Sequence, residues 1–102
     1  MNLKKVIKRS IRIRNQYHKL ESKYHGSEWS VEEDALAFLT DAGLVGRLVI
    51  DNPKRWPIEN GEEQLKHKLG ECVWWLAILA DRMNSDLETC VDKFLDKTAK
   101  MF

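Results

Sequence analysis

Apolar residues recur every three or four positions along four segments of the chain, and no segment alternates strictly between apolar and polar residues as a half-buried strand would. Such spacing places the apolar side chains on one face of a helix. The pattern predicts helices over about residues 3–24, 31–51, 61–82 and from about 86 onward. We therefore expect an all-α four-helix bundle that forms a single domain over residues 1–102.

Residues typical of helix ends separate these segments. Gly26 follows the first segment, where a glycine commonly ends a helix, and Pro53 follows the second, where proline cannot continue one. Capping boxes pair a small polar residue with a glutamate three positions later. Three are predicted: Ser30 with Glu33, Asn60 with Glu63, and Ser85 with Glu88.

Two of the predicted helices are strongly apolar, yet each carries one carboxylate. Residues 69–80, LGECVWWLAILA, contain Glu71 as their only charged residue, and residues 35–50 contain Asp41 as their only acid. A buried carboxylate is costly unless it is neutralised. We expect Asp41 and Glu71 to face inward and to need a metal, a cation or a proton.

The third helix carries two apolar stripes, which implies packing partners on two sides. One stripe alternates steps of four and three residues, and the other lies beside it. A chain of 102 residues gains stability when subunits share burial. We expect one partner to be the chain's own bundle and the other a second subunit, giving a homodimer or homotetramer. The two stripes are Leu65, Leu69, Cys72, Leu76, Leu79 and Met83, and Glu71, Trp74, Ile78 and Asp81.

Charge is distributed unevenly, although the net charge is only +1. Residues 1–25 contain eight Lys or Arg residues and one acid, so the remainder is acidic. Such a basic segment can bind phosphate, nucleic acid or an acidic neighbouring subunit. We expect a solvated helix face that also pairs with the acidic remainder. Nucleic-acid binding ranks last, because no readout motif is present.

Composition also bears on location. Residues 1–14 lack the apolar core of a signal peptide, and no apolar run approaches the length of a membrane span, so we expect a cytoplasmic protein without a membrane partner. Cys72 and Cys90 lack a metal-binding spacing, and we expect both to be reduced core residues.

The segment from Trp29 to Leu95 resembles the MazG-like nucleotide pyrophosphohydrolases, most closely over residues 65–88, LKHKLGECVWWLAILADRMNSDLE. The resemblance implies an all-α oligomer that hydrolyses nucleoside triphosphates to the monophosphate and pyrophosphate with Mg²⁺. The family's EExxE motif falls on Thr40, Asp41 and Leu44, and its ExxD motif on Lys68 and Glu71. Asp41 and Glu71 are thus the expected catalytic and metal-binding residues.

Three of the family's acidic positions are not acidic here, namely Thr40, Leu44 and Lys68, and the leucine and the lysine replace two strong metal ligands. If Lys68 points between the helices, its ammonium group can neutralise Asp41 and Glu71 in place of Mg²⁺. A lysine that merely extends to solvent is the alternative. Asp34 and His67 are weaker candidates for a metal site completed with Asp41 and Glu71.

The resemblance and the local chemistry suggest further contacts for a substrate. Lys54 and Arg55 are candidates for phosphate binding and Trp56 for stacking on a base, although a rigid corner with Trp56 packed inward explains the same residues. The other candidates are Lys68, Trp75 and Asp81. Two functions stay open: a magnesium-dependent nucleoside triphosphate pyrophosphohydrolase, and a catalytically degenerate module for nucleotide or protein binding in which Lys68 replaces the metal.

Overall fold

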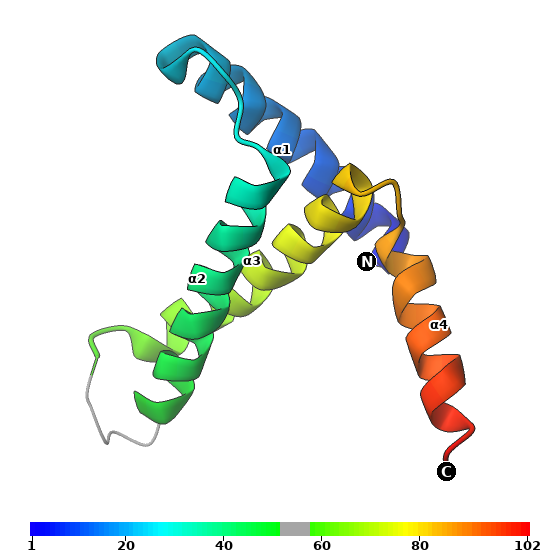
Figure 1. Cartoon of the computed structure of the whole chain (residues 1–102). Helices are drawn as coiled ribbons and strands as arrows, with labels where there is room; N and C mark the ends of the chain where they lie inside the picture. The colour runs from blue at the N-terminus through cyan, green and yellow to red at the C-terminus, as the bar shows by residue number, and fades with distance from the viewer. Residues whose placement is uncertain (52–57) are drawn as a thin grey trace. The chain divides into compact units, whose positions relative to one another are not determined.

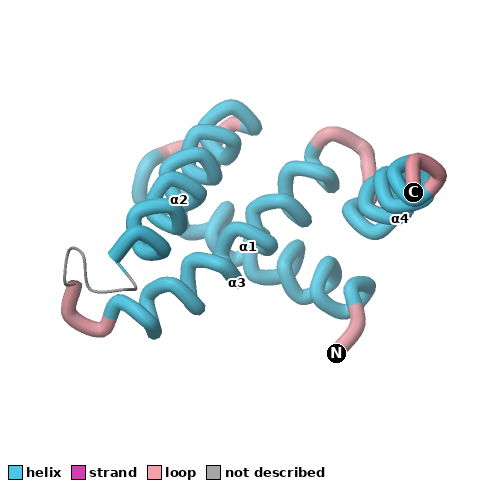
Figure 2. The backbone as a smooth tube through the Cα atoms, turned by 90° about the horizontal axis from the view of Figure 1, so that it is seen from below, coloured by secondary structure: helices cyan, strands magenta, loops and turns pink. Residues whose placement is uncertain are grey.

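A computed structural model describes residues 1–51 and 58–102 of the chain. Every regular element in these two ranges is an α-helix, and no strand occurs in them (Figures 1 and 2). The predicted all-helical fold class is therefore confirmed. The helices are α1 (Leu3–His25), α2 (Val31–Asp51), α3 (Gly61–Arg82) and α4 (Leu87–Ala99). None of the described helices has the length and apolar character that crossing a membrane requires.

The ends of α1 and α2 follow directly from local sequence. The Asn2 side chain accepts a hydrogen bond from the Lys5 amide at 2.9 Å, and Gly26 ends α1 with a φ of 79°. Before α2, the Ser30 hydroxyl accepts from the Glu33 amide at 3.1 Å, while the Glu33 carboxylate accepts from the Ser30 amide at 3.0 Å. This reciprocal pair is the predicted capping box.

The predictions of the other two capping boxes, before α3 and α4, are wrong. An N-cap residue normally has extended backbone, but Asn60 before α3 has a φ of 57°. The side-chain hydrogen bond at this end of α3 runs from the Gln64 amide group to the Glu59 carbonyl. At α4 the cap is Asp86 rather than Ser85, because the Asp86 carboxylate accepts from the Thr89 amide at 3.0 Å. A carboxylate is a strong acceptor for a free helix N–H, so the aspartate one residue later takes this role.

The end of α3 is closed by backbone hydrogen bonds around Asn84. The Ser85 amide donates to the Ala80 carbonyl at 2.7 Å, and the Asn84 amide donates to the Asp81 carbonyl at 3.1 Å. Asn84 has a φ of 58°, which completes a Schellman motif. Asn84 is therefore the residue at which α3 is closed.

The helices belong to two compact units, and the boundary between them falls within α3. One unit comprises Met1–Trp29 with Leu76–Phe102, and the other comprises Ser30–Trp75. In the first, α1 and α4 contact each other, and Lys4 lies 4.0 Å from Glu88. In the second, α2 and the first part of α3 are joined by side-chain hydrogen bonds.

Burial corrects one expectation about the apolar residues. Cys90 is exposed and Cys72 only partly buried, so Cys90 is not a core residue. The Cys90 Sγ atom lies 3.2 Å from the Ser85 hydroxyl beside the start of α4. On α3, Leu69 and Val73 remain exposed within the single chain.

A buried ion pair organises the unit that contains α1. The Arg14 side chain is only 4% exposed, and its Nη1 atom lies 2.7 Å from the Glu21 carboxylate. Glu21 also accepts from the Trp29 amide at 2.8 Å, and Arg82 donates to the Trp29 carbonyl at 2.8 Å. These contacts hold the chain after α1 against the C-terminal turn of α3.

Candidate functional site

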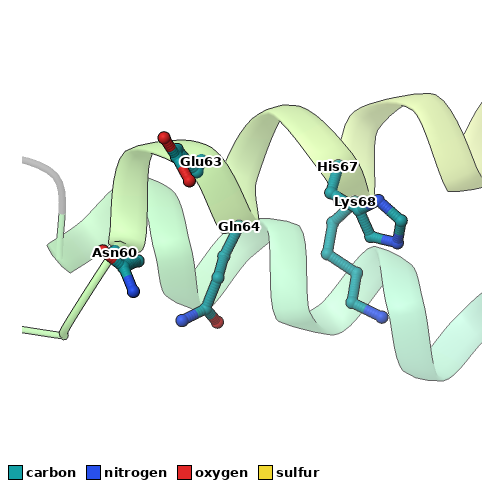
Figure 3. A pocket seen from close by; sticks show the side chains of 5 residues that line it. All are labelled: Asn60, Glu63, Gln64, His67 and Lys68. Atoms are coloured by element: carbon teal, nitrogen blue, oxygen red, sulfur yellow. The ribbon is translucent and has the colours of Figure 1, made fainter.

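The candidate site lies in the second unit, where one lysine of α3 lies between two carboxylates. Lys68 Nζ lies 3.0 Å from Asp41 Oδ1 and 2.8 Å from Glu71 Oε1. Asp41 comes from α2 and Glu71 from the next turn of α3, so the lysine joins the two helices. The contact predicted for Lys68 is confirmed: its side chain extends toward α2 rather than into solvent (Figure 3).

Spacing along the helices explains why these groups meet. Lys68 and Glu71 are three residues apart and therefore lie on one face of α3. Trp75 lies one turn beyond Glu71 on the same face. Its indole N–H donates to Asp41 Oδ2 at 2.8 Å. Both oxygens of Asp41 are thus hydrogen-bonded, one by the ammonium group and one by the indole.

The three charged groups differ in exposure. The side chain of Asp41 is 12% exposed, whereas those of Lys68 and Glu71 are 26% and 27% exposed. Asp41 therefore faces inward as predicted, but Glu71 lies at the edge of the site. His67 Nε2 approaches Glu71 at 3.9 Å from a largely exposed ring.

Hydrogen bonding keeps Asp41 and Lys68 charged. Burial by itself raises the pKa of the Asp41 carboxyl, but the hydrogen bonds from Lys68 and Trp75 outweigh burial and bring this pKa below its ordinary value. Hydrogen bonds to Glu71 and Asp41 raise the pKa of the Lys68 ammonium group. Burial next to the two carboxylates raises the pKa of the Cys72 thiol, so Cys72 is a poor nucleophile.

The donor set does not fit a magnesium site. Mg²⁺ requires several oxygen ligands in near-octahedral geometry. Within the described ranges, no three His, Cys, Asp or Glu side chains gather closely enough to hold a metal ion. The grouping of Asp34, Asp41, His67 and Glu71 is therefore not formed. Lys68 instead directs an ammonium group to the two carboxylates that would have to ligate the cation.

The remaining predicted site residues differ in their surroundings. Asp34 is fully buried on α2, and Asp81 is exposed near the end of α3. Leu44, at a position where the resembling enzymes have an acid, is 42% exposed. Trp75 is buried, and its polar atom is directed to Asp41. Lys54, Arg55 and Trp56 lie outside the described residues.

A shallow depression of about 330 Å³ adjoins the ion pairs on α3. Gln64 and Lys68 extend from α3 on the same side, one helical turn apart (Figure 3). The depression carries an acid, Glu63, and its lysine is already bonded to two carboxylates. Its charge therefore does not favour a triphosphate. The lining residues are Asn60, Glu63, Gln64, His67 and Lys68.

Sequence reasoning missed two features of the structure. The hydrogen bond from Trp75 to Asp41 joins residues 34 positions apart, and no local pattern signals it. The Arg14 and Glu21 pair could have been found, because the two residues lie seven apart on the face of α1 that also carries Ile7, where charged residues are unusual.

Comparison of the chain with protein-family models, with curated proteins and with solved structures gives no match.

Proposed function

We propose that this chain is a catalytically degenerate MazG-like helical module, in which the Lys68 ammonium group takes the place of magnesium, and that it acts by binding protein rather than by hydrolysing nucleotides. The observation that carries this proposal is the pair of ion contacts from Lys68 to Asp41 and Glu71, at 3.0 and 2.8 Å. A fixed cation between two carboxylates satisfies them without a metal.

Electrostatics favours this function over magnesium-dependent hydrolysis. Hydrolysis of a triphosphate needs bound cations that neutralise the phosphate oxygens and activate water. A divalent ion binding at Asp41 and Glu71 would have to displace Lys68 from both of its hydrogen bonds. While Lys68 is paired with Asp41 and Glu71, these two carboxylates neutralise its ammonium group, so it attracts a phosphate only weakly. The residues therefore suit a structural contact between helices.

The deciding experiment combines a pyrophosphate-release assay with thermal melting, each with and without Mg²⁺. The wild-type chain is expected to release no pyrophosphate from any of the common nucleoside triphosphates, and Mg²⁺ is expected to leave its melting temperature unchanged. Lys68→Glu exchanges the ammonium group for a third carboxylate beside Asp41 and Glu71. Mg²⁺ is expected to raise the melting temperature of this variant by about 5 °C, since an ion that binds only the folded state stabilises it.

Lys66→Glu is the matched control, because Lys66 is exposed on the same helix and the charge change is the same. Magnesium should not alter its melting temperature. Magnesium-dependent pyrophosphate release by the wild type, lost in Asp41→Asn, would refute the proposal and identify the chain as an active hydrolase.

We further propose that the module forms a homo-oligomer through the exposed side of α2. Apolar and small residues recur there in steps of three and four, and all are exposed in the single chain. A Cβ atom added at Gly43 or Gly46 would have no neighbour within 4 Å, so a second helix has room to approach the backbone closely. The stripe comprises Leu36, Leu39, Gly43, Gly46 and Ile50.

Leu39→Glu is expected to convert the oligomer into monomers, because the charge would be buried unpaired at the interface. Leu39 is 63% exposed in one chain, so the change should leave the fold of the monomer intact. Sedimentation equilibrium at several concentrations measures the mass. Met101→Glu, at an exposed residue near the C-terminus, should keep the wild-type mass. A monomeric wild type would contradict the proposed interface.

A further inference from the structure

Six cations of α1 lie on one face of the helix. The other five lie 3, 4, 7, 14 and 18 residues after Lys5, so all six project within about 60° of a common direction. All six side chains are exposed, and Gln16 lies on the same face between Arg12 and Lys19. We call this the basic face of α1. It comprises Lys5, Lys8, Arg9, Arg12, Lys19 and Lys23.

Within residues 1–51 and 58–102, acidic side chains do not neutralise the basic face. The single acid of α1, Glu21, is bonded to buried Arg14 on the opposite side of the helix. Among the described residues, two other side chains of α1 approach acids from outside the face: Lys4 lies 4.0 Å from Glu88, and His18 lies 3.4 Å from Glu28. Within those same ranges, no ion pair involves the first five of the six cations, and the sixth, Lys23, lies over the Tyr24 ring at 5.2 Å.

The basic face is solvated, as the sequence suggests, and Lys4 beside it pairs with Glu88, but within the described residues the six cations themselves form no ion pair with the acidic remainder. Five neighbouring cations without partners repel one another, and the repulsion is relieved when a polyanion binds. The face runs about 27 Å along a straight helix, which matches about eight phosphates of one strand of a duplex.

We propose that the basic face of α1 binds the phosphate backbone of a nucleic-acid duplex, without reading its sequence. The proposal rests on charge and geometry alone and does not depend on the function proposed for the Lys68 site. Binding of this kind is electrostatic, salt-dependent and weak.

An anionic membrane is the other polyanion to weigh, and the structure does not favour it. A helix that lies on a membrane inserts the face opposite its cations. In α1 the side directly opposite the cations is occupied by the protein, since Ile7, Ser10 and Arg14 are buried there, and the exposed apolar side chains of Ile13, Tyr17, Leu20 and Tyr24 lie to one side of the basic face. Two of the three buried side chains are polar, and exposing them to lipid would break the ion pair with Glu21.

Fluorescence anisotropy with a labelled duplex of about 20 base pairs tests the proposal. The logarithm of the association constant should fall against the logarithm of the salt concentration with a slope of about −5, as six phosphate contacts require. Neutralising four cations, in K5Q/K8Q/R9Q/R12Q, should reduce the slope to about −2 and weaken binding at low salt by about tenfold or more.

The matched control neutralises four exposed lysines elsewhere, in K66Q/K93Q/K97Q/K100Q, and lowers the net charge equally. It should keep the wild-type slope. Equal losses in both variants would show a general effect of net charge and overturn the proposal. Binding of the wild type to vesicles with anionic lipid but not to the duplex would overturn it too. If circular dichroism shows that the first variant has lost helix, K19Q/K23Q replaces it, with an expected slope of about −4.

Discussion

Lys68→Met is expected to lower the free energy of unfolding by about 2–3 kcal/mol. Methionine keeps the length of the side chain but removes the ammonium group that is hydrogen-bonded to Asp41 and Glu71. The two carboxylates then face each other without a cation, and Asp41 is largely buried. The predicted loss is moderate because Lys68 and Glu71 are about one quarter exposed, and water screens part of the repulsion. Urea denaturation at pH 7 measures it.

Two further variants isolate the cause. Lys66→Met, on the exposed side of the same helix, should change stability by less than about 0.5 kcal/mol. Adding Asp41→Asn to Lys68→Met should recover part of the loss, because one of the two stranded charges is then gone. If the loss of stability in the double variant instead equals the sum of the losses in Lys68→Met and Asp41→Asn, the two residues are not coupled.

The same substitution should change how stability depends on pH. The pKa of Asp41 in the folded state is lowered below its ordinary 3.8, so its stabilising contribution is present above that pH and is lost as the pH falls through the folded value. The pKa of Lys68 is raised above its ordinary 10.5, so its contribution persists up to that pH and is lost as the pH rises through the folded value.

The difference in stability between wild type and Lys68→Met should therefore be constant from about pH 5 to pH 9 and smaller at pH 3. Urea titrations at pH 3, 5, 7 and 9 provide the test. A difference that grows toward pH 3 has the wrong sign and would exclude the ion pairs as the source of the stabilisation.

Arg14→Met is expected to destabilise the unit containing α1 by about 3 kcal/mol. Arg14 is almost fully buried, and its guanidinium group approaches both oxygens of Glu21, at 2.7 and 3.4 Å. Removing it leaves the Glu21 carboxylate, itself 12% exposed, without its nearest cation. Since Glu21 also accepts from the Trp29 amide, the loss should loosen the chain after α1.

Thermal melting of Arg14→Met, together with hydrogen exchange of the Trp29 amide, measures both effects. Arg12→Met is the control, because Arg12 is exposed two residues away and should cost less than about 0.5 kcal/mol. Arg14→Lys keeps the charge but not the two-pronged geometry, so an intermediate loss is expected. Equal stability of Arg14→Met and wild type would mean that the pair contributes nothing.

The ion pair between Arg14 and Glu21 should also make the stability of the protein fall at low pH. Burial raises the pKa of Glu21, but the hydrogen bonds from Arg14 and from the Trp29 amide outweigh it, and the net pKa lies below the ordinary value of 4.5. The Glu21 contribution is thus present above that pH and lost below it.

Sequence alone determined the elements of this protein, because helices and their ends depend on neighbours a few residues away. The three- and four-residue spacing of apolar side chains indicated the four helices, and Gly26 and the Ser30 capping box marked two of their ends correctly. Where two candidate caps compete, as Ser85 and Asp86 do, local pattern is ambiguous and the stronger acceptor formed the cap.

Local pattern also identified Asp41 and Glu71 as carboxylates in need of a metal, a cation or a proton, and the family resemblance indicated Lys68 as a candidate for the cation. Only the tertiary structure placed Lys68 beside Asp41, because the two residues are 27 positions apart and their contact depends on how α2 and α3 pack. Packing likewise gave Trp75 its bond to Asp41, buried Arg14 and left the basic face of α1 exposed. The sequence determines which hydrogen bonds and ion pairs each residue is able to form. The packing of the helices determines which residues come close enough to form them.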